Sequence, residues 1–215
     1  MCWSAEVSLL TFISSTTMCG YLWYRNMEND RAIALWIFAF SLMQLFEFFM
    51  WIDMKNHTLS AKLSLVFILA QPLVLALALL QLGAIQDNNF IRWLLYGFIG
   101  IALVKVLYTI YYAFYIDKDN KWLSVKGENC HLVWYFVKNE NNMPFLTRIN
   151  YLYYWPLLLT CLCIKPLPLG IMYALFGAIT FNFSNYYYGM EYGSIWCWIA
   201  NAMGIFAIAS KHFYV

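Results

Sequence analysis

A chain of 215 residues that is 63% hydrophobic and only 11% charged does not fit an ordinary soluble domain, because most side chains of a protein this size lie near its surface. Its aromatic content of 20% and mean hydropathy of +0.61 agree with that exclusion. The composition predicts a polytopic membrane protein, and the formal net charge of +2 is too small to indicate a nucleic-acid partner.

Apolar runs of about 20 residues, each long enough to cross a bilayer as a helix, recur along the chain. The first run has no basic segment ahead of it and contains Glu6 near its start, so we expect an uncleaved span and not a signal peptide. Residues 1–215 are predicted to form a single all-α integral membrane domain, a bundle of seven transmembrane helices. The expected spans are 4–24, 32–54, 61–85, 90–116, 149–164, 169–190 and 194–213.

A polar extramembrane segment, residues 117–148, separates the fourth and fifth expected spans. Residues 121–126 and 130–137 resemble two strands around the turn Gly127-Glu128-Asn129, which predicts a short β-hairpin. One interpretation places this hairpin on the membrane surface, with its Trp and Tyr side chains at headgroup level. The other makes it a lid over a cavity between the helices, since long patterned loops are often functional.

Seven spans would place the N-terminus and the 117–148 segment on one side of the membrane. Lys and Arg near the short connections favour the opposite side as cytoplasmic, although the long segment reverses that count. Asn56-His57-Thr58 is a glycosylation sequon on the N-terminal side. Three cysteines also fall there, so an oxidising compartment would permit a disulfide from Cys130 to Cys2 or Cys197. We expect the N-terminus outside the cell or in a lumen.

Glu47 lies deep inside the second apolar run, where a carboxylate is costly unless it faces a partner or a water-filled cavity. At a rise of about 1.5 Å per residue, polar residues of four other spans fall in the same slab of the membrane. Lys105 is the basic candidate to pair with Glu47. The alternatives are a protonated structural acid at Glu47 and a snorkelling side chain at Lys105. The predicted ligand-binding residues are Gln44, Glu47, Gln71, Lys105, Tyr108, Tyr112, Asn182, Asn185 and Asn201.

Motifs for several kinds of chemistry are missing from the sequence. His57, His131 and His212 lie outside the deep parts of the spans, so a bis-histidine haem or an intramembrane His-ligated metal is not expected. There is no H-E-x-x-H, no Gly-rich phosphate loop and no G-x-S-x-G. We therefore predict no catalytic residues, no metal site and no cofactor; an enzyme would have to use Glu47 as an acid or base.

Three stretches of the first half resemble a known family. Residues 1–6 (Met-Cys-Trp-Ser-Ala-Glu), 42–47 (Leu-Met-Gln-Leu-Phe-Glu) and 70–72 (Ala-Gln-Pro) are similar to uncharacterised membrane proteins of bacteria, algae and large DNA viruses that begin with Met-Cys-Trp-Ser. The resemblance covers the first three expected spans and implies no activity. It implies that Trp3, Glu6, Glu47 and Gln71 belong to the family pattern.

The expected function is to bind or translocate a small molecule or ion through a polar pocket open toward the N-terminal side, as a transporter or receptor does. The alternative is a structural or assembly subunit of a cellular or viral membrane, in which polar residues only fix helix packing; a membrane enzyme using Glu47 is a third reading. Membrane lipid is the expected partner, and a homo-oligomer is left open. A solvent-connected cavity lined by Glu47, Gln71 and Asn185 would favour the first reading, and a dry core the second.

Overall fold

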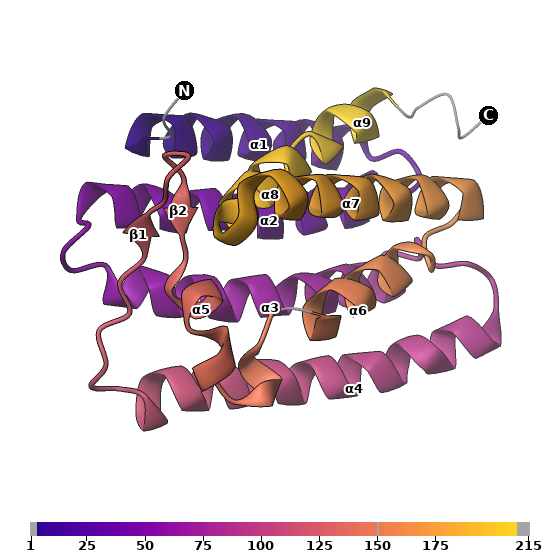
Figure 1. The fold of residues 1–215 in the computed structure, drawn as a ribbon. Helices are drawn as coiled ribbons and strands as arrows, with labels where there is room; N and C mark the ends of the chain where they lie inside the picture. Colours follow the sequence, from indigo (N-terminus) through magenta and orange to yellow (C-terminus); the bar gives the residue numbers. More distant parts are fainter. Residues whose placement is uncertain (1–3, 150, 210–215) are drawn as a thin grey trace.

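The computed structural model describes residues 4–149 and 151–209, and these residues are mostly helical (Figure 1). A π-helical turn, Tyr112–Ile116, extends α4, and 3-10 turns occur at Glu140–Asn142, Phe145–Thr147 and Gly189–Glu191. The helices are α1 (Ala5–Arg25), α2 (Asp30–Ile52), α3 (Thr58–Gln81), α4 (Asn89–Tyr111), α5 (Tyr135–Lys138), α6 (Tyr151–Cys161), α7 (Leu167–Tyr188), α8 (Tyr192–Ala200) and α9 (Met203–Ala209); the strands are β1 (Val125–Lys126) and β2 (Leu132–Val133).

Four helical segments among the described residues are long enough and apolar enough to cross a membrane, as judged by length and composition. They are Asp30–Ile52, Thr58–Gln81, Asn89–Ile116 and Leu167–Ala209. The last segment is 43 residues long and contains α7, α8 and α9. The chain is therefore a helical membrane protein, and the all-α class predicted from the sequence is confirmed.

The other expected spans differ from the prediction in instructive ways. α1 is 21 residues long but rich in serine and threonine, which lower its hydropathy, and it is not among the four segments. α6 has only 11 residues and contains Pro156. The expected span 194–213 is divided into α8 and α9 by a turn at Asn201 and Ala202, and its last residues, 210–213, lie outside the described part of the chain.

The helices form two layers (Figure 1). α1, α2, α3 and α4 lie side by side in chain order, each packed against the next. The second layer covers them: α6 packs against α3, α8 against α2, and α9 against both α1 and α2. α2 is consequently enclosed on several sides, whereas α4 lies at the edge of the bundle with most of its side chains exposed.

Aromatic side chains join the two layers around α2. Trp36 meets Tyr173 of α7 edge to face at 5.8 Å between ring centroids, and Phe40 meets Trp196 of α8 in the same way at 6.0 Å. Such contacts add about 0.5–1.5 kcal/mol each beyond the area that they bury. At the far end of the bundle from the N-terminus, Arg25 forms a 2.7 Å ion pair with Asp30 and donates to the carbonyl of Ile208, tying α9 to the α1–α2 turn.

Candidate functional site: a buried polar cluster at Glu47

The 117–148 segment folds over the end of the bundle that contains the start of α1 and the α2–α3 turn (Figure 1). Within it, β1 and β2 pair antiparallel, with Val125 opposite Val133 and Lys126 opposite Leu132. The paired strands are only two residues each, because the chain then turns into the bundle and buries its apolar side chains. Trp122, Leu132, Trp134 and Phe136 are all almost fully buried.

Glu191, in the turn between α7 and α8, holds the hairpin. Its Oε1 accepts a hydrogen bond from the backbone N–H of Asn129 at 2.9 Å, and its Oε2 accepts one from that of His131 at 2.9 Å. A Cβ atom at Gly127 would lie 2.3 Å from the Glu191 carboxyl carbon, so a larger residue at this turn would displace the Glu191 side chain. The carboxylate therefore organises the hairpin from the bundle side.

His57, at the start of α3, anchors the other end of the segment. Its Nε2 accepts a hydrogen bond from the backbone N–H of Ser124 at 2.7 Å, while its Nδ1 lies 2.9 Å from the carbonyl oxygen of Asp53. These two bonds together require a neutral imidazole whose proton is on Nδ1. Ser124 Oγ in turn accepts from the backbone N–H of Tyr135 at 3.2 Å.

Trp134 connects this docked segment to Glu47. The indole Nε1 donates a 2.9 Å hydrogen bond to Glu47 Oε1, and both side chains are buried, Glu47 completely. The ring is packed against Gly193 of α8, where an added Cβ would come within 2.5 Å of the indole Cζ3. Glycine at position 193 is thus what admits the indole between the loop and the bundle.

Several polar atoms beside the carboxylate have no hydrogen-bond partner among the described residues, although they are buried. They are Glu47 Oε2, Oε1 and Nε2 of Gln44, and Oγ of Ser194. The side chains of Gln44 and Ser194 are near enough to the Glu47 carboxylate to act on it electrostatically. Their distances and angles do not meet the criteria for a hydrogen bond to it. Buried polar groups in proteins are normally paired, so such a concentration around one carboxylate is a candidate binding site.

Gln71 and Tyr153 extend the polar cluster into α3 and α6. The Tyr153 hydroxyl donates to Gln71 Oε1, and Gln71 Nε2 donates to the carbonyl of Ala39 on α2 at 3.3 Å. Both side chains are buried, and Tyr153 meets Trp196 of α8 edge to face at 5.6 Å between ring centroids. These hydrogen bonds link α6, α3 and α2 through buried polar groups.

The structure does not pair Glu47 with Lys105, the partner expected from the sequence. No ion pair in the described part of the chain joins them; Lys105 Nζ instead donates to the backbone carbonyl of Arg148 at 3.2 Å. The physical reason is that Trp134, from the 117–148 segment, occupies the position beside the carboxylate. Lys105 lies on the edge helix α4, and its amine binds the backbone at the end of that segment instead.

Two predicted site residues lie away from the cluster. Asn182 and Asn185 are exposed on the outer face of α7, contrary to the inward orientation expected for them, and Asn182 Nδ2 is satisfied by the carbonyl of Ala178 at 2.7 Å.

Asn201 is buried but donates within its own helix to the carbonyl of Cys197 at 2.6 Å. Tyr108 and Tyr112 are half-buried on α4 and its π-turn, and Tyr112 packs against Trp122.

The open pocket expected toward the N-terminal side is filled by the docked segment. Glu47 and Gln71 are both completely shielded from solvent, and Asn185 lies elsewhere, so the described core meets the criterion set from the sequence for the structural alternative and not the one for an open pocket. The sequence missed the residues that complete the site. Trp134, Tyr153 and Ser194 carry no motif. The patterned segment 117–148, which the lid interpretation singled out without naming a side chain, was a signal for Trp134 and not for the other two.

Cys130 is disulfide-bonded in the structure. Cys197, one of its two expected partners, is instead a free and fully buried thiol, so that alternative is wrong. Cys2, the other expected partner, lies outside the described residues. The residues that the structure describes contain no group of three or more His, Cys, Asp and Glu side chains that could hold a metal ion.

Comparisons with known proteins found no similar protein: no family model, no curated protein and no solved structure matches the chain.

Proposed function

We propose that the protein is a seven-span membrane protein that binds a small monovalent cation at Glu47, in a state closed by the 117–148 segment. One observation carries the proposal: the carboxylate is completely buried, and Gln44, Ser194 and its own Oε2 present unpaired polar atoms around it. A lone buried charge is expensive unless a counter-charge accompanies it. A cation bound at this carboxylate supplies that charge.

The chemistry of the surrounding atoms favours a small hard cation. Carboxylate, amide carbonyl and hydroxyl oxygens are the ligands that such ions prefer, and Glu47, Gln44 and Ser194 offer one of each. A single carboxylate neutralises one positive charge, which favours a monovalent ion over a divalent one. A proton on Glu47 is the limiting case of the same chemistry and competes with the ion for the same oxygen.

The docked segment acts as the lid in this proposal. Trp134 reaches Glu47 from this segment and donates to the carboxylate, so exchange of the ion past the segment requires the indole to withdraw. The contacts to Glu191 and His57 are short and specific, which supports a defined closed state.

Seven spans, with α8 and α9 together forming the last, agree with the way successive connections alternate between the two ends of the bundle (Figure 1). A disulfide at Cys130 and an exposed Asn56 in its sequon support an N-terminal side that faces outside the cell or into a lumen.

Thermal unfolding of the purified protein in detergent tests the site. Na⁺, K⁺ and Li⁺ are compared at constant ionic strength against N-methylglucamine, a cation too large for the site. Binding at 100 times Kd stabilises the folded state by about 2.7 kcal/mol, so we expect a saturable rise in the unfolding temperature with at least one ion. Glu47→Gln should abolish that rise, whereas the control Glu128→Gln, an exposed loop acid, should keep it. An identical response to all four cations would favour the structural-subunit alternative.

A further inference from the structure

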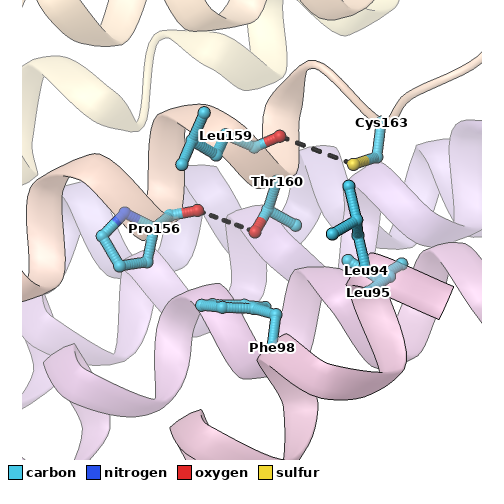
Figure 2. A pocket seen from close by; sticks show the side chains of 7 residues that line it. All are labelled: Leu94, Leu95, Phe98, Pro156, Leu159, Thr160 and Cys163. Atoms are coloured by element: carbon cyan, nitrogen blue, oxygen red, sulfur yellow. Dashed lines mark hydrogen bonds between the residues drawn. The ribbon is translucent and has the colours of Figure 1, made fainter. Parts of the chain in front are cut away.

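A second cavity lies between α4 and α6, at the edge of the bundle. Both helices pack against α3 but make few contacts with each other. The space between them has a volume of about 310 Å³, within the range of ligand pockets (Figure 2). Its lining residues are Leu94, Leu95, Phe98, Pro156, Leu159, Thr160 and Cys163.

The polar groups in this wall are turned back onto their own helix. Thr160 Oγ1 donates to the carbonyl of Pro156 at 2.7 Å, and Cys163 Sγ donates to that of Leu159 at 3.5 Å, as Figure 2 shows. Opposite them, Phe98 and its neighbours on α4 present hydrocarbon. The cavity therefore offers almost purely apolar contacts to anything that enters it.

A second cavity, lined in part by a lysine, adjoins the apolar one. A smaller cavity of about 40 Å³ shares Phe98 and Pro156 with the first and is lined at its other end by Lys105 and Tyr153. Lys105 is the one residue with a cationic side chain among all those lining the two cavities, and it is nearly buried. We call the two cavities together the α4–α6 groove.

We propose that the α4–α6 groove binds a long-chain fatty acid, with its carboxylate at Lys105 and its acyl chain along Phe98, Pro156 and Leu159. Charge complementarity carries the choice of occupant: two adjoining apolar cavities, the smaller of which is lined by Lys105, match a single acyl chain that ends in one negative charge. α4 belongs to one of the candidate membrane spans, so lipid is the medium that reaches the groove. This site is separate from Glu47, and it stands or falls independently of the cation proposal.

Glu140 provides an internal check on this assignment. Its negative charge acts on Lys105 from the loop, so it opposes a carboxylate approaching the same amine. Removing that charge with Glu140→Gln should strengthen fatty-acid binding, while Lys105→Met should weaken it. A merely structural role for Lys105 gives no reason for the two variants to act in opposite directions.

The test uses the full chain in phosphatidylcholine nanodiscs and a palmitic acid that carries a diazirine on its acyl chain. After photolysis, we expect labelled peptides from residues 94–105 and 156–163. Palmitic acid should compete for the label, and its methyl ester, which has no charge, should not. Lys105→Met should lower the affinity at least tenfold. Leu159→Trp should block the groove, and Leu175→Trp, at a similarly exposed leucine of α7, should leave the labelling unchanged.

Three results would overturn the assignment. One is equal competition by palmitic acid and its methyl ester; another is label spread evenly over the exposed leucines of α7. The third is competition by lysophosphatidic acid where palmitic acid has no effect, which would make the headgroup a phosphate. The competition arms use the wild-type protein, so they decide the matter even if Lys105→Met does not fold.

Discussion

The environment of Glu47 is set by individual side chains that belong to distant parts of the chain. Trp134 comes from the loop, Ser194 and Gly193 from α8, and Gln44 from the preceding turn of α2. An indole N–H donates but cannot accept, so Trp134 satisfies one carboxylate oxygen and leaves the second to other partners. Under the proposed function, this division leaves one carboxylate oxygen for the ion while Trp134 holds the other in the closed state.

A double-mutant cycle should show strong coupling between Glu47 and Trp134. Hydrogen bonds to charged groups contribute about 1.5–3 kcal/mol, and residues in contact give interaction energies of that order. We expect Glu47→Gln and Trp134→Phe to couple by about 1 kcal/mol or more in the free energy of unfolding in detergent. The matched cycle of Glu47→Gln with Lys105→Met should be additive to within about 0.5 kcal/mol. Coupling in the second cycle and additivity in the first would reverse the assignment made here.

Gly193→Ala should displace the indole of Trp134, although the substitution adds only one methyl group. The new Cβ would lie 2.5 Å from Cζ3 and 2.7 Å from Cε3 of Trp134, so the ring must move. Overpacking of this kind costs about 1–3 kcal/mol. Gly100→Ala on α4 is the control, because nothing lies within 4 Å of its added Cβ and alanine favours the helix. Unfolding measurements and hydrogen exchange of residues 117–148 should separate the two variants; equal behaviour would mean that the indole is not held as described.

The 117–148 segment shows which parts of an element can be predicted from local sequence alternation and which cannot. Its alternation predicted strands at 121–126 and 130–137, and paired residues do lie within both ranges. Local pattern could not show that the second run leaves the pairing after Val133 and carries Trp134 inward, since that depends on Gly193 and Glu47, more than 50 residues away on either side. Anchors such as Glu191 are equally non-local.

Docking of this segment should weaken in acid through His131. Burial lowers the pKa of His131 from 6.5 to about 4, against the opposing influence of Glu191. The unfolded or undocked segment therefore takes up a proton at a higher pH than the docked one. Stability from docking is complete above pH 6.5 and is lost as the pH falls from 6.5 toward 4.

Hydrogen exchange of the segment, corrected for intrinsic rates, measures this loss between pH 7.5 and 4.5. His131→Gln removes the titrating group, so its protection should vary less with pH than that of the wild-type protein. Protection of the wild-type segment that stays constant across this range would contradict the assignment of the acid response to His131.

Across the bundle, the sequence predicted where the helices lie along the chain better than it predicted their rotation about the helix axis. Apolar run lengths located α2, α3 and α4 closely, because a span must be apolar over a fixed length. On α7, however, Tyr173, Gly177 and Ser184 form the buried stripe, at helical spacing. Asn185 is the next residue after Ser184 and is rotated by about 100°, which takes it out of that stripe. A uniform hydrophobic surround gives no periodic signal to reveal this, and the amide of Asn182 is satisfied within its own helix.

The proposed topology makes a prediction that depends on the entire chain. Single cysteines introduced at Asn56 and Asn129, in a background with the half-buried thiol of Cys163 removed, should react with an impermeant reagent from one side of the membrane, and one at Asn88 from the other. Non-reducing peptide mass spectrometry should find Cys130 in a disulfide and Cys19, Cys161 and Cys197 as thiols, because those three are buried and unbonded.

If the side carrying Asn129 is the oxidising one, both results follow from a single orientation, with the lid, Trp134 and the route to Glu47 facing outside or into a lumen. Labelling of Asn88 and Asn129 from the same side would mean that α4 does not cross the membrane; the α4–α6 groove would then lose its access to lipid, and the assignment of Glu47 to the middle of a seven-span bundle would fail with it.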